Sequence, residues 1–278
     1  MKKERNSSQT IVQDSMDTHI SNKERLTVVK VGGAVVEDES QLTRLLQDFS
    51  NISGNKVLVH GGGRKATKTA TLLGIESKMV GGRRITDADM LEVVTMVYGG
   101  LVNKNLVARL QAHGVNALGL TGADMNVIKS HKRPLRDGID FGFVGDVDKV
   151  DGEMLATLIS KGITPVMAPL THDGQGNMLN TNADTIASET AKALAPYYDV
   201  TLVFSFEKKG VLANTDDDSV IPVITKDDFL KYKADGTISG GMIPKLENAL
   251  AAIEAGVNSV VITNASDING KQGTVIRK

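Results

Sequence analysis

The sequence contains no cysteine and no tryptophan, and aromatic residues make up only 4% of its 278 residues. Without cysteine the chain can form neither disulfides nor thiolate metal sites, and it has no cysteine nucleophile. The absence agrees with a reducing compartment, so we expect a cytoplasmic protein.

The chain also lacks an excess of positive or negative residues, and it lacks long apolar runs. The formal net charge is -1, which excludes the electrostatic footprint of a general nucleic-acid or membrane-surface binder. The apolar runs are far shorter than the ~18 residues of a membrane span. Residues 1–25 are polar and lack the apolar middle of a signal peptide, so we expect a flexible N-terminal extension. The expected partners are small molecules, with no nucleic acid and no membrane.

Short apolar runs alternate along the chain with stretches of helical periodicity. The runs are typical of parallel strands covered on both faces, and the alternation predicts an α/β fold, a three-layer αβα sandwich with a mostly parallel central sheet. Two segments, 79–86 and 127–150, are expected to form hairpins over one end of that sheet. Strands are expected at 26–31, 56–60, 116–120, 163–170, 200–205 and 258–265, and helices at 38–50, 63–74, 87–112, 151–161, 183–195, 225–233 and 243–256.

Two glycine turns, "KVGG" at 30–33 and "HGGG" at 60–63, each follow a predicted strand and lead toward a helix. Their backbone N–H groups would lie on the same rim of the sheet and could bind an extended anionic ligand, with Lys30 adding a positive charge. The alternative is that each pair is only a tight turn. His60 is expected to be a structural hydrogen-bonding residue rather than a catalyst.

The second turn also fits the dinucleotide-binding fingerprint, because Gly61, Gly63 and Ala66 spell G-x-G-x-x-A. The fingerprint lies on the second strand, however, and is followed by Arg83 and Arg84 instead of an acidic residue for a ribose. These arginines could accept a 2'-phosphate. An NADP-binding oxidoreductase therefore stays open as a remote alternative.

Further polar residues are predicted to lie at or near this rim. Asn182 is expected to cap a helix that has Asp184 in its first turn, and Asn180 would point over the rim. Lys245 lies near the start of the last predicted helix, an unfavourable place for a cation unless an anion faces it. Two lysines, two glycine turns and a carboxylate together suit phosphoryl transfer, in which catalysis is mainly positioning and electrostatic stabilisation.

The stretches "KVGGAVV", "LVHGGGRKAT", "GRRIT", "NTNAD" and "GGMIPK" combine G-G-G, x-R-[IV]-T, N-x-N-A-D and G-G-M-x-x-K. With these motifs the chain resembles the amino acid kinase family over residues 26–278, and most of all its members that phosphorylate N-acetylglutamate. The resemblance implies ATP-dependent phosphorylation of the side-chain carboxylate of an N-acyl-L-glutamate, N-acetyl before other acyl groups, in arginine biosynthesis. It also implies Mg²⁺ bound with the nucleotide, a homodimer or higher homo-oligomer, an acyl-glutamate-binding lobe at 26–195 and a nucleotide-binding lobe at 196–278.

The resemblance also assigns roles to residues. Lys30 and Lys245 would stabilise the transferring phosphoryl group, and Asp184 would hold both lysines. Since neighbours on an extended strand face opposite sides, only one of Arg83 and Arg84 should enter the site. No residue is expected to bind a metal directly. The acceptor would be bound by Gly62, Gly63, Arg84 and Asn180, and the nucleotide by Gly32, Gly33, Lys209 and Gly210.

The chain departs from the family pattern at "FSFEKKGVL", residues 204–212, where many relatives have an aspartate followed by x-x-G-[VI]. Phe206 and Glu207 stand there instead. Either Glu207 supplies the missing carboxylate, or the loop holds the nucleotide through its backbone and Lys208 or Lys209. The alternatives for function are N-succinylglutamate as acceptor, another amino acid kinase such as glutamate 5-kinase or aspartokinase, and a non-catalytic regulatory homologue.

Overall fold

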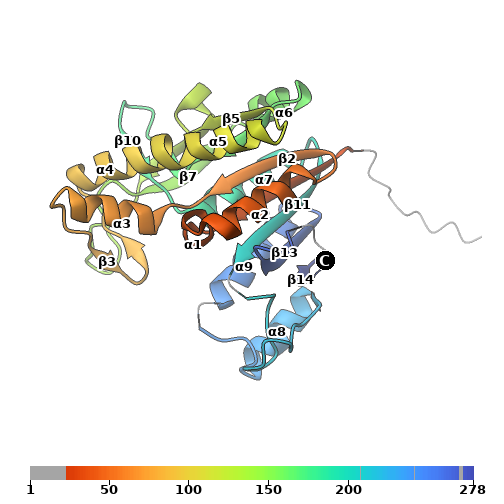
Figure 1. The fold of residues 1–278 in the computed structure, drawn as a ribbon. Coiled ribbons are helices and arrows are strands. Elements are labelled where there is room, and N and C mark those ends of the chain that lie inside the picture. The colour runs from red at the N-terminus through yellow and green to blue at the C-terminus, as the bar shows by residue number, and fades with distance from the viewer. Residues whose placement is uncertain (1–22, 207, 241, 269–271) are drawn as a thin grey trace, which may run out of the picture.

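The structure is a computed structural model that describes residues 23–206, 208–240, 242–268 and 272–278. The predicted extension at 1–25 lies almost entirely outside these residues, as does Glu207, for which a nucleotide contact was considered. The described chain folds into three layers, with a central sheet between two layers of helices (Figure 1). The predicted αβα sandwich is therefore confirmed.

The central sheet has eight strands in the order β12-β14-β13-β11-β1-β2-β8-β5. Every neighbouring pair is parallel except β13 and β14, which confirms a mostly parallel sheet. The strands are β1 Arg25–Val31, β2 Asn55–His60, β5 Ala117–Leu120, β8 Thr164–Met167, β11 Asp199–Phe206, β12 Val223–Ile224, β13 Ser259–Asn264 and β14 Thr274–Ile276.

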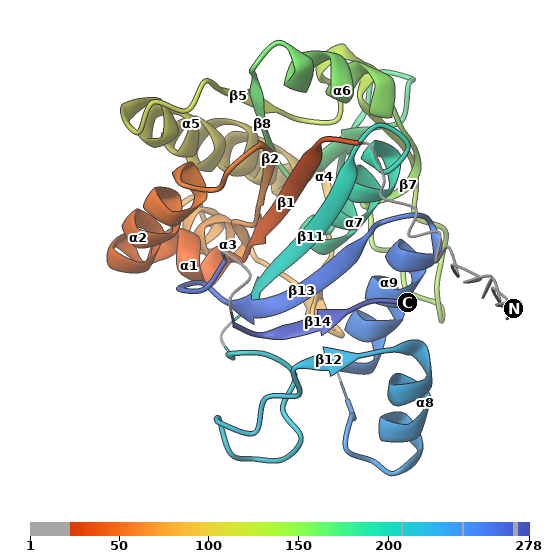
Figure 2. The same ribbon diagram turned by 90° about the vertical axis from the view of Figure 1, so that its right-hand side faces the viewer.

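Helices cover both faces of this sheet (Figure 2). Successive residues of β1 belong to different cores, since Val28 packs in one hydrophobic cluster and Val29 in the other. This explains the almost continuous apolar runs. One face carries α1 Gly33–Glu37, α2 Glu39–Ser50, α3 Gly63–Leu72, α4 Ala88–Val94, the π-helix η1 Thr95–Val102 and α5 Asn103–Ala112, and the other α6 Gly152–Ser160, α7 Ala183–Leu194 and α9 Met242–Glu254. Among the helices in these described ranges, none is both long and apolar enough to cross a membrane.

Both predicted hairpins are present. β3 Met79–Val80 pairs antiparallel with β4 Arg83–Arg84, and β6 Ile128–Lys132 with β7 Gly145–Val150. The second hairpin belongs to a four-stranded sheet, β10-β9-β6-β7, which the sequence did not predict. Its connection lies against the end of the first hairpin, because the amides of residues 86 and 143 donate to the carbonyls of residues 141 and 86.

Some elements differ from the prediction in their extent or type, or were not predicted. The predicted strand 163–170 is divided into β8 and β9 Leu170–His172, which belong to different sheets. The predicted helix 87–112 is continuous, but its middle turn is the π-helix η1, an arrangement that often marks a functional site. The short strands β10 Met178–Asn180, β12 and β14 were not predicted, because two or three residues owe their extended conformation to pairing rather than to their own sequence. Two helical elements remain. They are the 3₁₀ turn η2 Asp124–Asn126 and the helix α8 Lys226–Ala234.

Candidate active site

The two glycine turns lie side by side at the carboxyl ends of β1 and β2, which are adjacent parallel strands. The Gly61 amide donates to the Val31 carbonyl over 2.9 Å. A Cβ on Gly33 would lie 3.3 Å from the backbone nitrogens of Gly62 and Gly63, and one on Gly61 would lie 3.0 Å from the nitrogen of Gly33. The turns thus pack backbone against backbone, with their N–H groups on one rim and little room for side chains.

His60 fixes the base of the second turn. Its ring is fully buried, with Nδ1 2.9 Å from the Gly61 carbonyl oxygen and Nε2 3.1 Å from Nδ2 of Asn103. Asn103 Nδ2 also donates to the Val166 carbonyl over 2.9 Å. Burial lowers the pKa of His60 to about 4, so at neutral pH Nδ1 donates and Nε2 accepts. The predicted structural role of His60 is confirmed. Its partner Asn103 was missed, because a buried amide inside a helical segment has no sequence signature.

An ion pair between a buried lysine and a partly exposed aspartate joins β1 to α7. The Lys30 ammonium lies 2.7 Å from Oδ1 of Asp184, and the Lys30 side chain is only 10% exposed. Asp184 is placed by the start of α7, where the side chain of Asn182 accepts from the amides of Asp184 and Thr185 over 2.7 and 3.2 Å. The predicted helix cap is therefore present.

Both predicted lysines contact the same aromatic ring. The Nζ atom of Lys245 lies 3.8 Å from the centroid of the Phe206 ring, and Nζ of Lys30 lies 5.5 Å from it. The sequence pointed to Phe206 only as a departure from a pattern. Its contact with the two lysines was not foreseeable, because it depends on how β1, β11 and α9 meet in space.

The two lysines line a cavity of about 480 Å³ at the carboxyl end of the sheet, here named the lysine cavity. Gly32, Gly33 and Gly210 line it as well. Lys209 does not, because its ammonium pairs with Asp218 over 2.5 Å on an exposed loop. The other lining residues are Ala34, Val35, Gly63, Arg64, Ser205, Phe206, Lys208, Met242 and Ile262.

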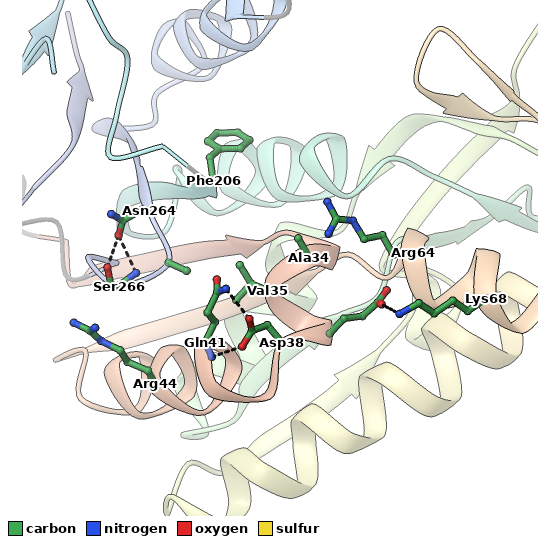
Figure 3. A pocket seen from close by; sticks show the side chains of 12 residues that line it. Ala34, Val35, Asp38, Gln41, Arg44, Arg64, Lys68, Phe206, Asn264 and Ser266 are labelled. Carbon is green, nitrogen blue, oxygen red and sulfur yellow. Dashed lines mark hydrogen bonds and ion pairs between the residues drawn. The ribbon is translucent and has the colours of Figure 1, made fainter. Parts of the chain in front are cut away.

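A wider cavity of about 760 Å³, the outer cavity, adjoins the lysine cavity and shares Ala34, Val35, Arg64 and Phe206 with it. Figure 3 shows Phe206 on one side of this space and the start of α2 on the other. A Lys68–Glu37 pair of 2.8 Å closes one end. Its remaining lining residues are Asp38, Gln41, Arg44, Asn264, Ala265 and Ser266.

A third cavity, of about 330 Å³ and here named the arginine cavity, brings together all four residues predicted to bind the acceptor. Gly62, Gly63, Arg84 and Asn180 line it, and so does Asp184. The lysine and arginine cavities therefore meet at Gly63 and at the Lys30–Asp184 pair. Tyr98, Arg133 and Thr181 also line the arginine cavity, and none of them was predicted as a site residue.

Arg84 is 8% exposed and is held firmly by the protein. Its Nη2 donates to the Gly63 carbonyl over 2.9 Å and to Oγ1 of Thr67 over 2.8 Å, while Nη1 donates to Ser77. Tyr98, from η1, packs its ring against Gly62. A Cβ on residue 62 would lie 2.9 Å from the nearest ring atom. Burial raises the pKa of the Tyr98 phenol, and the neighbouring guanidinium of Arg84 opposes that rise.

Arg83 and Arg84 are both among the residues that line the arginine cavity. They make up β4, in which Arg84 is buried and Arg83 is exposed, so the expectation that only one of them enters the site stays a prediction. Burial, followed by the positive charges of Arg133 and Arg136, lowers the pKa of Arg83. Arg133 is itself paired with Asp146 over 2.5 Å. This side of the cavity therefore carries Arg83 and Arg84 together with the Arg133–Asp146 pair.

The fold and these motifs have known counterparts. The model of the amino acid kinase family matches residues 25–264. A protein named acetylglutamate kinase from Bacteroides thetaiotaomicron is 71% identical over 257 residues, which is 92% of this chain and 100% of that protein. Its namesake from Phocaeicola vulgatus is 70% identical with the same coverage. The crystal structure of smu.665 from Streptococcus mutans UA159 is 30% identical, with a TM-score of 0.71 over 91% of this chain and 98% of that one.

Proposed function

The chain belongs to the amino acid kinase family, and we propose that it transfers the γ-phosphoryl group of ATP to the side-chain carboxylate of N-acetyl-L-glutamate. The product is the acyl-glutamyl 5-phosphate, an intermediate of arginine biosynthesis. The observation that carries the proposal is the meeting of the lysine and arginine cavities at the Lys30–Asp184 pair. Relatives named acetylglutamate kinase, which the chain matches over their whole length, support the acceptor and favour this reaction over an NADP enzyme or a regulatory homologue.

In the proposed reaction an oxygen of the acceptor carboxylate attacks the γ-phosphorus, and the bond from that phosphorus to the bridging oxygen of ADP breaks. The carboxylate is ionised at neutral pH, so no general base is required. Negative charge spreads over the equatorial oxygens in the transition state. Lys30 and Lys245 stabilise this charge from two sides, and Asp184 holds the lysines in place. The ion pair of Lys30 and Asp184 supports these roles.

The arginine cavity is the proposed acceptor site. The N–H groups of Gly62 and Gly63 would bind the reacting carboxylate, Arg84 the α-carboxylate, and Asn180 the amide of the acyl group. The support is that all four line one cavity. The hydrogen bonds that hold Arg84 and the 2.9 Å bond from Asn180 to Oγ1 of Thr86 keep both side chains oriented before the acceptor binds.

The lysine cavity is the proposed nucleotide site. Gly32 and Gly33 would donate their N–H groups to the ATP phosphates, with Gly210 providing close approach of the loop that follows β11. We assigned Lys209 to the nucleotide from the sequence, and it could reach the phosphates only by leaving Asp218. Lys208 lines the cavity, and its ammonium pairs with Asp217 over 2.6 Å.

We propose that ATP binds as its Mg²⁺ complex. In the described part of the chain no group of three histidine, aspartate or glutamate side chains could hold a metal. In the proposal the ion would be carried mainly by phosphate oxygens and water, which is how Mg²⁺ is commonly bound at phosphoryl-transfer sites. When bound, the ion neutralises part of the phosphate charge.

We also propose how the chain is divided into lobes, how copies of it associate and where it is located. Residues 26–195 would form the acceptor lobe and residues 196–278 the nucleotide lobe, joined by the pairing of β1 with β11. We also propose a homodimer or higher homo-oligomer built on η1, where Met96 and Leu101 are 53% and 46% exposed, and the cytoplasm as the compartment.

N-Succinylglutamate is a second candidate acceptor, favoured by one observation. Arg83 and Arg133 line the arginine cavity in addition to Arg84. A succinyl group carries one more carboxylate than an acetyl group, and this anion would be stabilised there.

A hydroxamate assay tests the proposal, because hydroxylamine traps acyl phosphates. ATP-dependent hydroxamate formation is measured in parallel with N-acetylglutamate, N-succinylglutamate, glutamate and aspartate. We expect the highest kcat/KM with N-acetylglutamate. A higher value with the succinyl compound supports the second candidate instead, a higher value with glutamate or aspartate supports another amino acid kinase, and no hydroxamate with any acceptor overturns the proposal.

A further inference from the structure

Phe206 occupies a central place between the two proposed phosphate-binding lysines. It is the last residue of β11 and lines both the lysine cavity and the outer cavity (Figure 3). Its ring lies 3.8 Å from Nζ of Lys245 and 5.5 Å from Nζ of Lys30, measured to the ring centroid. The ring of Phe204 stacks against it, with a centroid distance of 5.9 Å and an angle of 23°. Phe204 is buried, so it supports the ring from the core side.

The contact with Lys245 differs from other contacts of the same kind. Elsewhere in the described ranges, Lys56, Lys132 and Lys233 lie over phenylalanine rings at 5.6 or 5.7 Å. Attraction between a cation and the negative face of a ring increases as the two approach and as water is excluded. The Lys245–Phe206 contact is therefore expected to be the strongest of this set.

An aromatic ring suits this position better than a second carboxylate would. Two ammonium groups that converge on one point repel each other, and Asp184 already balances Lys30. A further carboxylate would repel the incoming phosphates. The ring attracts an ammonium through its quadrupole and carries no net charge. It can therefore hold a lysine without neutralising the charge of that lysine.

We propose that Phe206 is a positioning residue that holds Lys245, and more weakly Lys30, in the orientation needed for phosphoryl transfer. The inference rests on the proposed function of the two lysines. It gives a role to Phe206, which directly precedes the position of the family's aspartate: the ring holds the lysines by cation–π attraction.

Stepwise fluorination of the ring tests this inference, since each fluorine withdraws electron density from the ring face with little change in shape. Phenylalanine carrying one, two or three fluorines is incorporated at position 206. We expect kcat/KM for ATP to fall with each fluorine, to a total of roughly tenfold. Phe206→Tyr should retain activity, and Phe206→Leu should lose at least as much as the trifluoro variant.

Phe229 provides a matched control. Lys233 lies 5.6 Å from its ring centroid on α8, and neither residue lines the three site cavities. The same fluorinated residues at position 229 should leave kcat/KM unchanged. A loss of activity that is equal at both positions would show a general packing effect and overturn the inference.

Proton NMR of the substrate-free protein gives a readout that does not depend on turnover. A methylene group beside an ammonium 3.8 Å from a ring centroid is shifted upfield by the ring current, so the Lys245 ε-protons should move downfield in Phe206→Leu. If the wild type forms acyl phosphate but the fluorine series is flat, the inference is wrong and the proposed function stands. If the wild type forms none with any acceptor, the proposed function fails and the inference with it.

Discussion

The ammonium of Lys30 and the carboxylate of Asp184, 2.7 Å apart, form the link between the lysine cavity and the arginine cavity. Lys30 comes from the strand that pairs with both β2 and β11, and Asp184 comes from the first turn of α7. Because the lysine side chain is nine-tenths buried, loss of its partner would leave a poorly solvated charge.

Asp184→Asn removes this partner while it keeps the size of the side chain. We expect kcat to fall by about 100-fold, the scale on which single electrostatic groups at active sites contribute, because Lys30 loses its orientation. Steady-state kinetics measures the effect. Glu254→Gln is the control, since it removes a 2.7 Å pair with Lys226 on the surface and should leave kcat unchanged. An Asp184→Asn enzyme with full kcat would contradict the role of the pair.

The buried His60 makes stability depend on pH. Its pKa is about 4 in the folded protein and near 6.5 in an unfolded chain. Between these values the unfolded chain binds more protons, so the stabilisation is present above about pH 6.5 and is lost as the pH falls toward 4. The loss is on the order of 3 kcal/mol. Urea unfolding of the wild type and His60→Asn at several pH values measures it, and parallel stability curves for the two proteins would refute it.

Gly33→Ala tests the contact between the two glycine turns. Its Cβ would lie 3.3 Å from the nitrogens of Gly62 and Gly63, so it would crowd two N–H groups proposed to bind the acceptor and displace one proposed to bind ATP. We expect kcat/KM to fall at least about tenfold, since a small misplacement of reacting groups is costly. Thermal unfolding of the same variant separates this effect from a loss of folded protein. Unchanged kinetics in the folded variant would argue against the assigned roles of the turns.

Arg83→Ala distinguishes the two candidate acceptors. It removes one cation from the arginine cavity and leaves the buried Arg84 in place. The pKa of the Arg83 cation is lowered by burial and by the charges of Arg133 and Arg136. If the extra charge serves a succinyl carboxylate, KM for N-succinylglutamate should rise about tenfold or more while KM for N-acetylglutamate changes little. Equal changes for both acceptors would show that Arg83 does not select the acyl group.

The sequence predicted those parts of the molecule that local chemistry determines. The apolar runs of β1, β2, β11 and β13 lie in the middle of the sheet and are buried on both faces, which gives a strong pattern. Asn182 at the start of α7 and His60 beside a glycine turn were also predicted, because each contacts backbone close to it in the chain.

Other features depend on contacts between distant segments and left no local pattern. The sheet β10-β9-β6-β7 is built from strands of three to six residues, and Tyr98 reaches the site through a π-helical turn. The contact of Phe206 with two lysines likewise needs β1, β11 and α9 in place.

Isotope transfer tests most directly that the acceptor carboxylate itself attacks ATP. N-Acetylglutamate labelled with ¹⁸O in its side-chain carboxylate is incubated with the protein, ATP, Mg²⁺ and hydroxylamine, and the released phosphate is analysed by ³¹P NMR. If the carboxylate oxygen attacks the γ-phosphorus, each phosphate released from the trapped acyl phosphate carries one ¹⁸O, and Lys30→Met and Lys245→Met should abolish the signal. Phosphate without ¹⁸O, or labelled phosphate formed equally well by the two lysine variants, would contradict the proposed chemistry.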